Sequence, residues 1–159
     1  MNNVTQKRRE KMKRVNLILA SMVLSTMFLF TSCEDEYTKI TFNDLPLLAR
    51  EFLNTHFPNE TISYIMEDNE ILEHSYEVNF TSGNNVDFKG DGEWYNVDCH
   101  SGSVPSSVLG EQICDYIETN HPESYAVEID RNTFTYDVEL NNGLELVFDL
   151  SFNFERYED

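Results

Sequence analysis

The strongest constraint on the fold is that the chain repeats itself. Residues 45–58 and residues 109–122 both carry apolar side chains three or four positions apart, and each stretch ends at a proline. This spacing places the apolar residues on one stripe of a helix, and a proline ends a helix near the residue before it. The matching apolar positions are Leu45, Ala49, Phe52 and Leu53 in the first stretch and Leu109, Ile113, Tyr116 and Ile117 in the second.

A common strand pattern follows both predicted helices. Residues 76–80 and 136–140 alternate apolar and polar side chains, as in strands with one buried and one solvent-exposed face. Gly83 and Gly143 then fit tight hairpins, because glycine readily takes a positive φ. Each copy therefore predicts a helix followed by about four antiparallel strands.

A single copy has too little apolar core to be comfortably stable. Joining two copies edge to edge hides one strand edge of each and covers more apolar area. We therefore predict an α+β fold in which two tandem helix-plus-four-strand repeats, residues 44–102 and residues 103–159, form one antiparallel sheet with the helices on one face.

The N-terminus has the features of an export signal. Six of the 11 basic residues precede Cys33, an apolar run occupies residues 15–30, and the small residues Thr31 and Ser32 come directly before the cysteine. This order is typical of a secretory signal peptide, and the apolar run is too short for a spanning helix. The sequence predicts a signal peptide at residues 1–32, with an uncleaved signal anchor as the alternative.

Residues 30–33 resemble a bacterial lipobox. In lipoproteins with this motif the cysteine thiol receives diacylglycerol, and several acyl chains together make a stable anchor. The resemblance implies that Cys33 is lipidated and that residues 33–43 form an acidic tether. It also implies a lipid-anchored place in the cell envelope, at the outer membrane and either periplasmic or surface-exposed.

The charge of the chain limits its partners. The formal net charge is −18, and every acidic residue except Glu10 follows Cys33. A field of this sign repels phosphate backbones and anionic headgroups. We therefore predict no nucleic-acid partner, contact with the membrane only through the anchor, and a protein or peptide as the partner.

The sequence shows no arrangement that carries catalysis or binds a cofactor. It has no G-x-S-x-G elbow, no nucleotide-binding glycine loop and no D-x-D-x-D-G calcium loop. The four histidines lack the i, i+4 spacing of a helical metal site. We predict that the protein is not an enzyme and has no cofactor or metal.

Two cysteines follow the predicted anchor. Cys99 and Cys114 are candidates for a disulfide, since an oxidising envelope allows thiols to pair. Cys114 also falls on a predicted helix beside Ile113 and Ile117, which fits a buried free thiol equally well. The sequence leaves their pairing open.

Several short motifs resemble the PepSY-like, beta-lactamase-inhibitor-like family of envelope lipoproteins. They are Leu45-Pro46, Thr55-His56-Phe57-Pro58, Tyr76-Glu77-Val78, Gly92-Glu93-Trp94, Val97-Asp98-Cys99, Val104-Pro105 and Asn142-Gly143-Leu144-Glu145. The resemblance implies a sheet with helices on one face and an open opposite face. By analogy of fold, it implies a non-enzymatic inhibitor or regulator of an extracellular or periplasmic protein such as a peptidase.

A comparison of the two copies gives a candidate binding face. The first copy has Ile62, Tyr64 and Met66 on the side predicted to face away from the helices. The second copy has Ala126, Glu128 and Asp130 at the matching positions. An exposed apolar strip is typical of an interaction surface.

Trp94 and Tyr95 can extend this strip, because both residue types are common at binding hot spots. The alternative is that Tyr64 and Met66 pack against a neighbouring strand and that Trp94 belongs to the core like Phe154. We favour a binding module that holds a protein or peptide; a structural or accessory lipoprotein that binds a small ligand or cation is the alternative.

Overall fold

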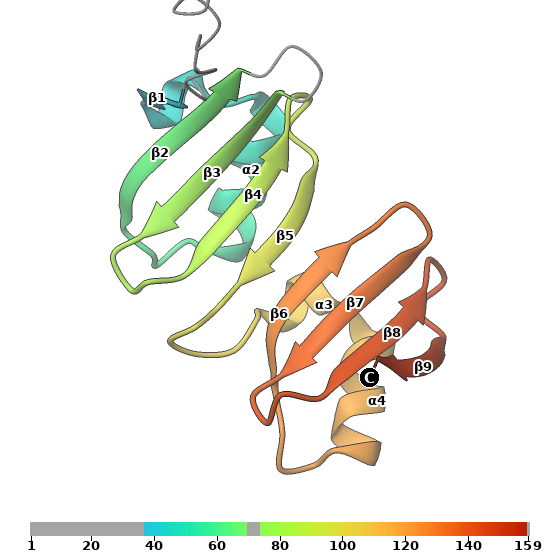
Figure 1. The fold of residues 1–159 in the computed structure, drawn as a ribbon. Helices are drawn as coiled ribbons and strands as arrows, with labels where there is room; N and C mark the ends of the chain where they lie inside the picture. Colours follow the sequence, from blue (N-terminus) through green and yellow to red (C-terminus); the bar gives the residue numbers. More distant parts are fainter. Residues whose placement is uncertain (1–36, 70–73, 159) are drawn as a thin grey trace, which may run out of the picture. The chain divides into compact units, whose positions relative to one another are not determined.

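The computed structural model describes residues 37–69 and 74–158. This part of the chain is an α+β fold built on one antiparallel sheet of nine strands, whose order in the sheet follows their order in the chain (Figure 1). The strands are β1 (Tyr37–Ile40), β2 (Ile62–Asn69), β3 (His74–Phe80), β4 (Asn85–Lys89), β5 (Trp94–Asp98), β6 (Ala126–Arg131), β7 (Thr135–Leu140), β8 (Glu145–Asp149) and β9 (Phe154–Glu158). The helices are the 3-10 turn η1 (Phe42–Asp44), α2 (Leu47–His56), α3 (Ser106–Leu109) and α4 (Glu111–Asn120).

The helices cover one face of the sheet, as predicted, and leave the other face open (Figure 1). None of the helices in the described ranges is long and apolar enough to cross a membrane. The predicted signal peptide at residues 1–32 and the candidate lipidation site Cys33 lie outside the described residues.

The core lies between the helices and the sheet. On the helices, Ala49 and Leu53 of α2 and Ile113 and Ile117 of α4 are buried, and they are four positions apart as one helical stripe requires. On the strands Val78, Val86, Val138 and Leu146 have no exposed surface. Each such side chain contributes about 1.5–3 kcal/mol on burial, so this layer holds the helices on the sheet.

The two halves of the sheet share their irregularities. The pairing of β2 with β3 shifts between Ile62 and Tyr64, and the pairing of β6 with β7 shifts between Ala126 and Glu128. The pairings of β4 with β5 and of β8 with β9 also contain one shift each. Each shift is a β-bulge, which adds one residue to a strand and changes the face on which the following side chains lie.

Strands β5 and β6 join the halves. Val97 lies opposite Ile129, with Asn96 opposite Asp130 on one side of it and Asp98 opposite Glu128 on the other. Val97 and Ile129 are fully buried. The open face therefore runs without a break from β1 to β9.

The structure corrects the predicted tether. Residues 37–40 form the edge strand β1, in which Tyr37 lies opposite Asp68 and Ile40 opposite Ile65. Ile40 packs against the core, and apolar contact of this kind draws the segment onto the sheet. Three of the four residues of β1 are exposed, and they follow the acidic residues 34–36, so the sequence of this segment suggested a solvated tether.

Candidate functional site

The open face of the sheet carries one row of opposed side chains that spans all nine strands. Residues opposite one another on neighbouring strands share a face, so the pairing register defines the row. We call it the central row: Lys39, Met66, Glu77, Asp87, Asn96, Asp130, Asp137, Val147 and Arg156. The two cations lie at the outer strands, and the four carboxylates lie between them.

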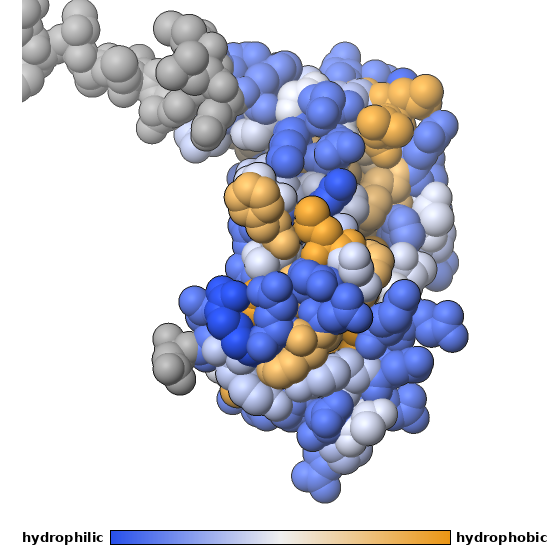
Figure 2. Space-filling view, turned by 90° about the vertical axis from the view of Figure 1, so that its right-hand side faces the viewer, coloured by the Kyte–Doolittle hydropathy of each residue, from blue (hydrophilic) through white to orange (hydrophobic). Residues whose placement is uncertain are grey.

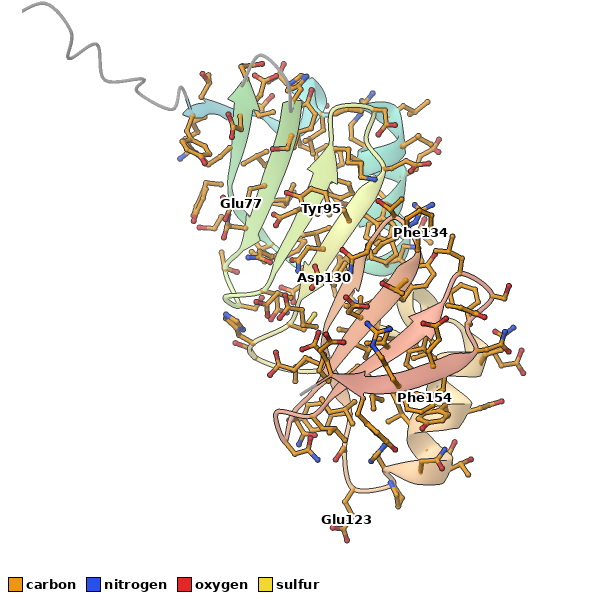
Figure 3. The ribbon with its side chains drawn as sticks, turned by 45° about the vertical axis from the view of Figure 1, so that its right-hand side comes forward. Glu77, Tyr95, Glu123, Asp130, Phe134 and Phe154 are labelled. Carbon is orange, nitrogen blue, oxygen red and sulfur yellow. The ribbon has the colours of Figure 1, made fainter. Side chains whose placement is uncertain are left out.

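Carboxylates stand directly opposite each other twice in this row. Glu77 of β3 faces Asp87 of β4, and Asp130 of β6 faces Asp137 of β7. Like charges in directly opposed positions destabilise a sheet. Figure 3 shows Glu77 in the first half and Asp130 in the second, near the middle of the sheet. The carboxylates of the row therefore repel one another, and a bound cation would reduce that repulsion.

Asp87 bears the largest electrostatic cost. The pKa of its carboxyl is raised from 3.8 to about 7, chiefly by burial and then by the negative charges of Glu77, Asp130, Asp98 and Glu128 in that order. Burial acts first because it removes water from the charged form. Near neutral pH this group readily exchanges its proton for another positive charge.

Asn96 partly offsets the repulsion at the centre of the sheet. Its Nδ2 donates to Glu128 Oε1 at 2.7 Å and to Asp130 Oδ1 at 3.0 Å. Nδ2 carries two protons, so both bonds use one amide. The amide thus draws two carboxylates of β6 toward one point on β5.

Two carboxylate oxygens of the row have no such support. Asp87 Oδ1 and Asp137 Oδ1 are buried and have no hydrogen-bond partner among the described residues. The other oxygen of Asp137 accepts a bond of 2.6 Å from Asn132 Nδ2. Buried acceptors without a donor are costly, so both atoms favour a ligand that donates hydrogen bonds.

A cavity of about 320 Å³ opens on the first half of this face. The side chains of Glu77 and Asp87 reach it from the central row, Met66 and Asp68 from β2, and Tyr95 from β5. Figure 3 shows Tyr95 on β5, which is separated from the strand of Glu77 by β4. Apolar surface and charge thus meet in one concave place, which is the usual form of a ligand site.

The structure brings part of the predicted binding strip to this cavity. Met66 and Tyr95 line it, and Tyr64 lies on the same face opposite Asn79. The side chain of Tyr64 is 39% exposed, which leaves it accessible to a partner. Binding by these three residues stays a prediction.

Ile62 is a correction. It lies opposite Phe80, which is buried on the helix side, and it packs against the core. The bulge between Ile62 and Tyr64 breaks the alternation, so these residues face opposite sides although they are two positions apart. Simple period-two alternation placed Ile62 on the wrong face.

Trp94 is a second correction, and the alternative considered from the sequence is right. Its ring centroid lies 5.7 Å from that of Phe52 of α2 and 6.3 Å from that of Tyr136 of β7, in stacked orientations. Its counterpart Phe154 stacks on Tyr116 of α4 at 4.5 Å. The bulge at Asp87 and Phe88 turns Trp94 toward the helices and Tyr95 toward the open face.

Cys99 and Cys114 are free thiols in the structure, which agrees with the free-thiol alternative and not with the disulfide. Cys99 is buried, and its amide donates to Val127 O at 2.7 Å. Cys114 lies in α4 with its Sγ 4.0 Å from Ser106 O. Burial raises the pKa of the Cys99 thiol to about 11, and a thiol held in its protonated form is a poor nucleophile.

Two of the four histidines each pair with one carboxylate. His74 Nε2 lies 2.9 Å from Glu67 Oε1, and His100 Nδ1 lies 2.7 Å from Asp98 Oδ1. Across residues 37–69 and 74–158, no three His, Cys, Asp or Glu side chains gather as metal ligands would.

Sequence reasoning missed the carboxylates of the central row. Acids are common after Cys33 and charged side chains are usually solvated, so the composition offered no reason to single these four out. Alternation gives the face of each residue but not its partner on the next strand. The signal that was present is that Glu77, Asp87, Asp130 and Asp137 all sit inside strands, a position that acids seldom favour.

The chain is similar to known proteins both in its sequence and in its structure. Residues 74–156 match a family model described as "Putative beta-lactamase-inhibitor-like, PepSY-like". A search of curated protein sequences finds no match.

Solved structures resemble the chain over most of its length. A "putative calcium-regulated periplasmic protein" from Bacteroides thetaiotaomicron is 36% identical, with a TM-score of 0.75 over 79% of this chain and 98% of that one. A "putative periplasmic protein" from Bacteroides vulgatus is 33% identical, with a TM-score of 0.73 over 79% of this chain and 99% of that one. A second one from Bacteroides vulgatus, of unknown function, is also 33% identical, with a TM-score of 0.71 over 77% of this chain and 99% of that one.

Proposed function

The chain belongs to the beta-lactamase-inhibitor-like, PepSY-like family, and from this premise we propose that it is a non-enzymatic binding module of the cell envelope. The open sheet face holds a basic segment of a protein partner. Through this contact the module inhibits or regulates an extracellular or periplasmic protein such as a peptidase.

The observation that carries the proposal is the pair of directly opposed carboxylates in each half of the central row. Glu77 and Asp87 face each other, as do Asp130 and Asp137, and the only cations of the row are Lys39 and Arg156 at its ends. A basic segment laid across the strands would neutralise this repulsion. Complementary charge of this kind chiefly sets partner choice and association rate.

Apolar side chains beside the row add contact area. Tyr64, Met66 and Tyr95 lie on the same face in the first half. Tyrosine supplies large contact area at low conformational cost, and apolar residues at the centre of an interface bring most of the affinity. The proposed partner therefore combines basic and apolar residues.

We expect the purified full chain to bind basic ten-residue peptides and not acidic peptides of the same apolar content. The affinity should fall steeply with added salt, because exposed charges are screened beyond about 8 Å at physiological ionic strength. The double variant Asp130→Asn, Asp137→Asn should weaken binding at least tenfold, measured by fluorescence anisotropy with labelled peptides.

The matched control is Asp115→Asn, Glu118→Asn, which removes two charges from the exposed side of α4. It should bind the basic peptides like the unchanged chain. Equal binding of acidic and basic peptides, or equal losses in the two double variants, would contradict the proposal.

The location belongs to the same proposal. The similar structures from Bacteroides are periplasmic proteins by name, which supports a place in the cell envelope, and the lipobox-like Thr31-Ser32-Cys33 supports an anchor at the outer membrane. Cys33→Ser should abolish incorporation of radiolabelled palmitate into the chain in growing cells. Labelling of the variant at the level of the unchanged chain would refute the anchor.

The second candidate function is an accessory envelope lipoprotein that binds a small ligand or cation. The name of the Bacteroides thetaiotaomicron protein as calcium-regulated favours it, and opposed carboxylates suit calcium. The described residues offer carboxylate pairs and no gathering of three ligands, which is a poor fit for a calcium site. In the peptide titration, calcium should displace a basic peptide no better than sodium chloride of equal ionic strength; stronger displacement favours this candidate.

We also infer that the two halves are tandem copies of one module. Both contain α-helix followed by four strands, and the bulges fall at matching pairs, Ile62/Tyr64 with Ala126/Glu128. The copies differ at the entry to the helix, where Gly110 separates α3 from α4 with a φ of 79°, a conformation that favours glycine. This difference, together with the cavity in the first half, supports different roles for the two copies. Only the first copy would then recognise an individual side chain of the partner.

A further inference from the structure

We propose that the cavity bounded by Tyr37, Met66, Tyr95, Asp68, Glu77 and Asp87 is a socket for one cationic side chain, a lysine or arginine of the docked partner. This inference rests on the proposed function and names the chemical group that the first half of the open face selects. The cavity differs from the rest of the central row, which attracts cations only by its charge, because the cavity has side-chain walls and a defined volume.

The cavity has a size that suits the extended end of a long side chain. Its volume is about 320 Å³, at the lower end of the range usual for small-ligand sites. It is open on one side, so a side chain can enter while its backbone stays on the sheet surface. The butyl or propyl stem of lysine or arginine is apolar, and such stems pack along apolar surface while the charged end seeks polar partners.

Walls of the cavity suit this stem and its charged end. Met66 offers a flexible, polarisable surface, and Tyr37 and Tyr95 supply aromatic rings whose faces attract cations. The cations nearest in the register are Lys39, opposite Met66, and Lys89, opposite Ser75. Both lysines are exposed, and neither belongs to the lining of the cavity.

The lining of the cavity also provides negative charge in a partly buried place. Glu77 and Asp87 stand opposite each other there, and Asp68 comes from β2. Asp87 Oδ1 is a buried acceptor with no hydrogen-bond partner among the described residues. Glu77 Oε1, by contrast, accepts a bond of 2.8 Å from Asn79 Nδ2. A donor from an ammonium or guanidinium group would satisfy Asp87 and separate the two negative charges.

The second half lacks these features at the matching positions. Asp130 stands in place of Met66 and Val147 in place of Asp87, and Val147 is fully buried. Glu155 stands in place of Tyr95 and lies 3.4 Å from Arg156 Nη1, an ion pair within its own strand. The aromatic wall and the unpartnered acid at these positions are therefore features of the first half.

The test observes the cavity directly. The full chain is labelled with ¹³C at the methionine methyl groups, and the Met66 signal is assigned with Met66→Leu. n-Butylammonium and ethylguanidinium chloride are the probes, with n-butanol and sodium chloride of equal concentration as controls. We expect at least one cation to shift the Met66 methyl signal saturably, with a Kd on the order of 1–10 mM, since a ligand of so few atoms binds weakly.

Asp87→Asn and Tyr95→Leu should each weaken this binding at least fivefold. Glu139→Gln, on the same face of β7 and opposite Glu128, is the matched control and should leave it unchanged. Basic peptides should shift the same Met66 signal as they bind.

The outcomes separate this inference from the proposed function. Peptides that bind without moving the Met66 signal, or cations that shift it no more than butanol does, would overturn the socket and leave the binding face intact. Cations that saturate the cavity while basic peptides fail to bind would overturn the proposed partner and leave the socket supported. Calcium that shifts Met66 where both organic cations fail would also overturn the socket.

Discussion

Replacing Trp94 by alanine is expected to lower the free energy of unfolding by about 3 kcal/mol, as truncation of a large core aromatic does. The ring of Trp94 is stacked between Phe52 of α2 and Tyr136 of β7, and it packs against the core. Its loss leaves a void between the first helix and a strand of the second half. Urea denaturation followed by circular dichroism measures the change.

Two neighbouring substitutions make this prediction selective. Trp94→Phe keeps an aromatic ring in the stack and should cost less than about 1.5 kcal/mol, in the range of milder core substitutions. Tyr95→Ala changes the next residue, which lines the cavity of the open face, and should cost less stability than Trp94→Ala while weakening peptide binding. If Trp94→Ala left stability unchanged and abolished binding, the assignment of Trp94 to the core would be wrong.

Asp87→Asn is expected to have the opposite effect on stability. In the folded chain the pKa of Asp87 is about 7, above its ordinary value of 3.8, because of burial first and the charges of Glu77, Asp130, Asp98 and Glu128 after it. Between about pH 4 and pH 7 the folded state therefore keeps a proton that the unfolded state has lost. The free energy of unfolding falls as the pH rises through this window and levels off above pH 7.

The asparagine variant removes this cost. Without solvent screening, a pKa shift of this size lowers the free energy of unfolding by about 4 kcal/mol when the carboxyl is ionised. Because Asp87 is only partly buried, solvent screening reduces the figure, and we expect the variant to be more stable than the unchanged chain by about 2 kcal/mol at pH 8. The difference should be small near pH 4, close to the ordinary pKa of 3.8, and should vanish at lower pH, where aspartate is protonated in both states.

Denaturation at pH 4 and pH 8 measures this difference, with Asp115→Asn on the exposed side of α4 as the control. A variant that loses stability at pH 8 would show that the carboxylate is satisfied in the folded chain. A variant that gains stability but binds organic cations less well would indicate that Asp87 is kept for binding, since functional groups often cost stability.

The fold class was predictable because its signals are local. The alternation in residues 76–80 and 136–140 and the helical stripe around Ala49 and Ile113 were enough to predict an α+β fold with helices on one face. The structure confirms the single antiparallel sheet. Family membership was also predicted correctly, from motifs that mark helix ends and hairpin turns.

The binding face was predictable only in part, because bulges and register are not local signals. One added residue moved Ile62 to the core side, and another turned Trp94 toward the helices and Tyr95 toward the open face. The opposition of Glu77 to Asp87 depends on how β3 and β4 align. That alignment follows from the whole sheet and its turns, so the sequence showed many acids without showing which ones meet.

The edge strand β1 limits how far the folded sheet can lie from the predicted lipid anchor. A chain extends by at most about 3.6 Å per residue, so the four residue steps from Cys33 to Tyr37 span no more than about 14 Å. If Cys33 is acylated, Tyr37 and the neighbouring edge of the socket stay within about 14 Å of the lipid anchor. This distance is shorter than the width of the sheet. A diffusing partner then has to come close to the lipid surface in order to bind. The module therefore binds only partners that are near its own membrane.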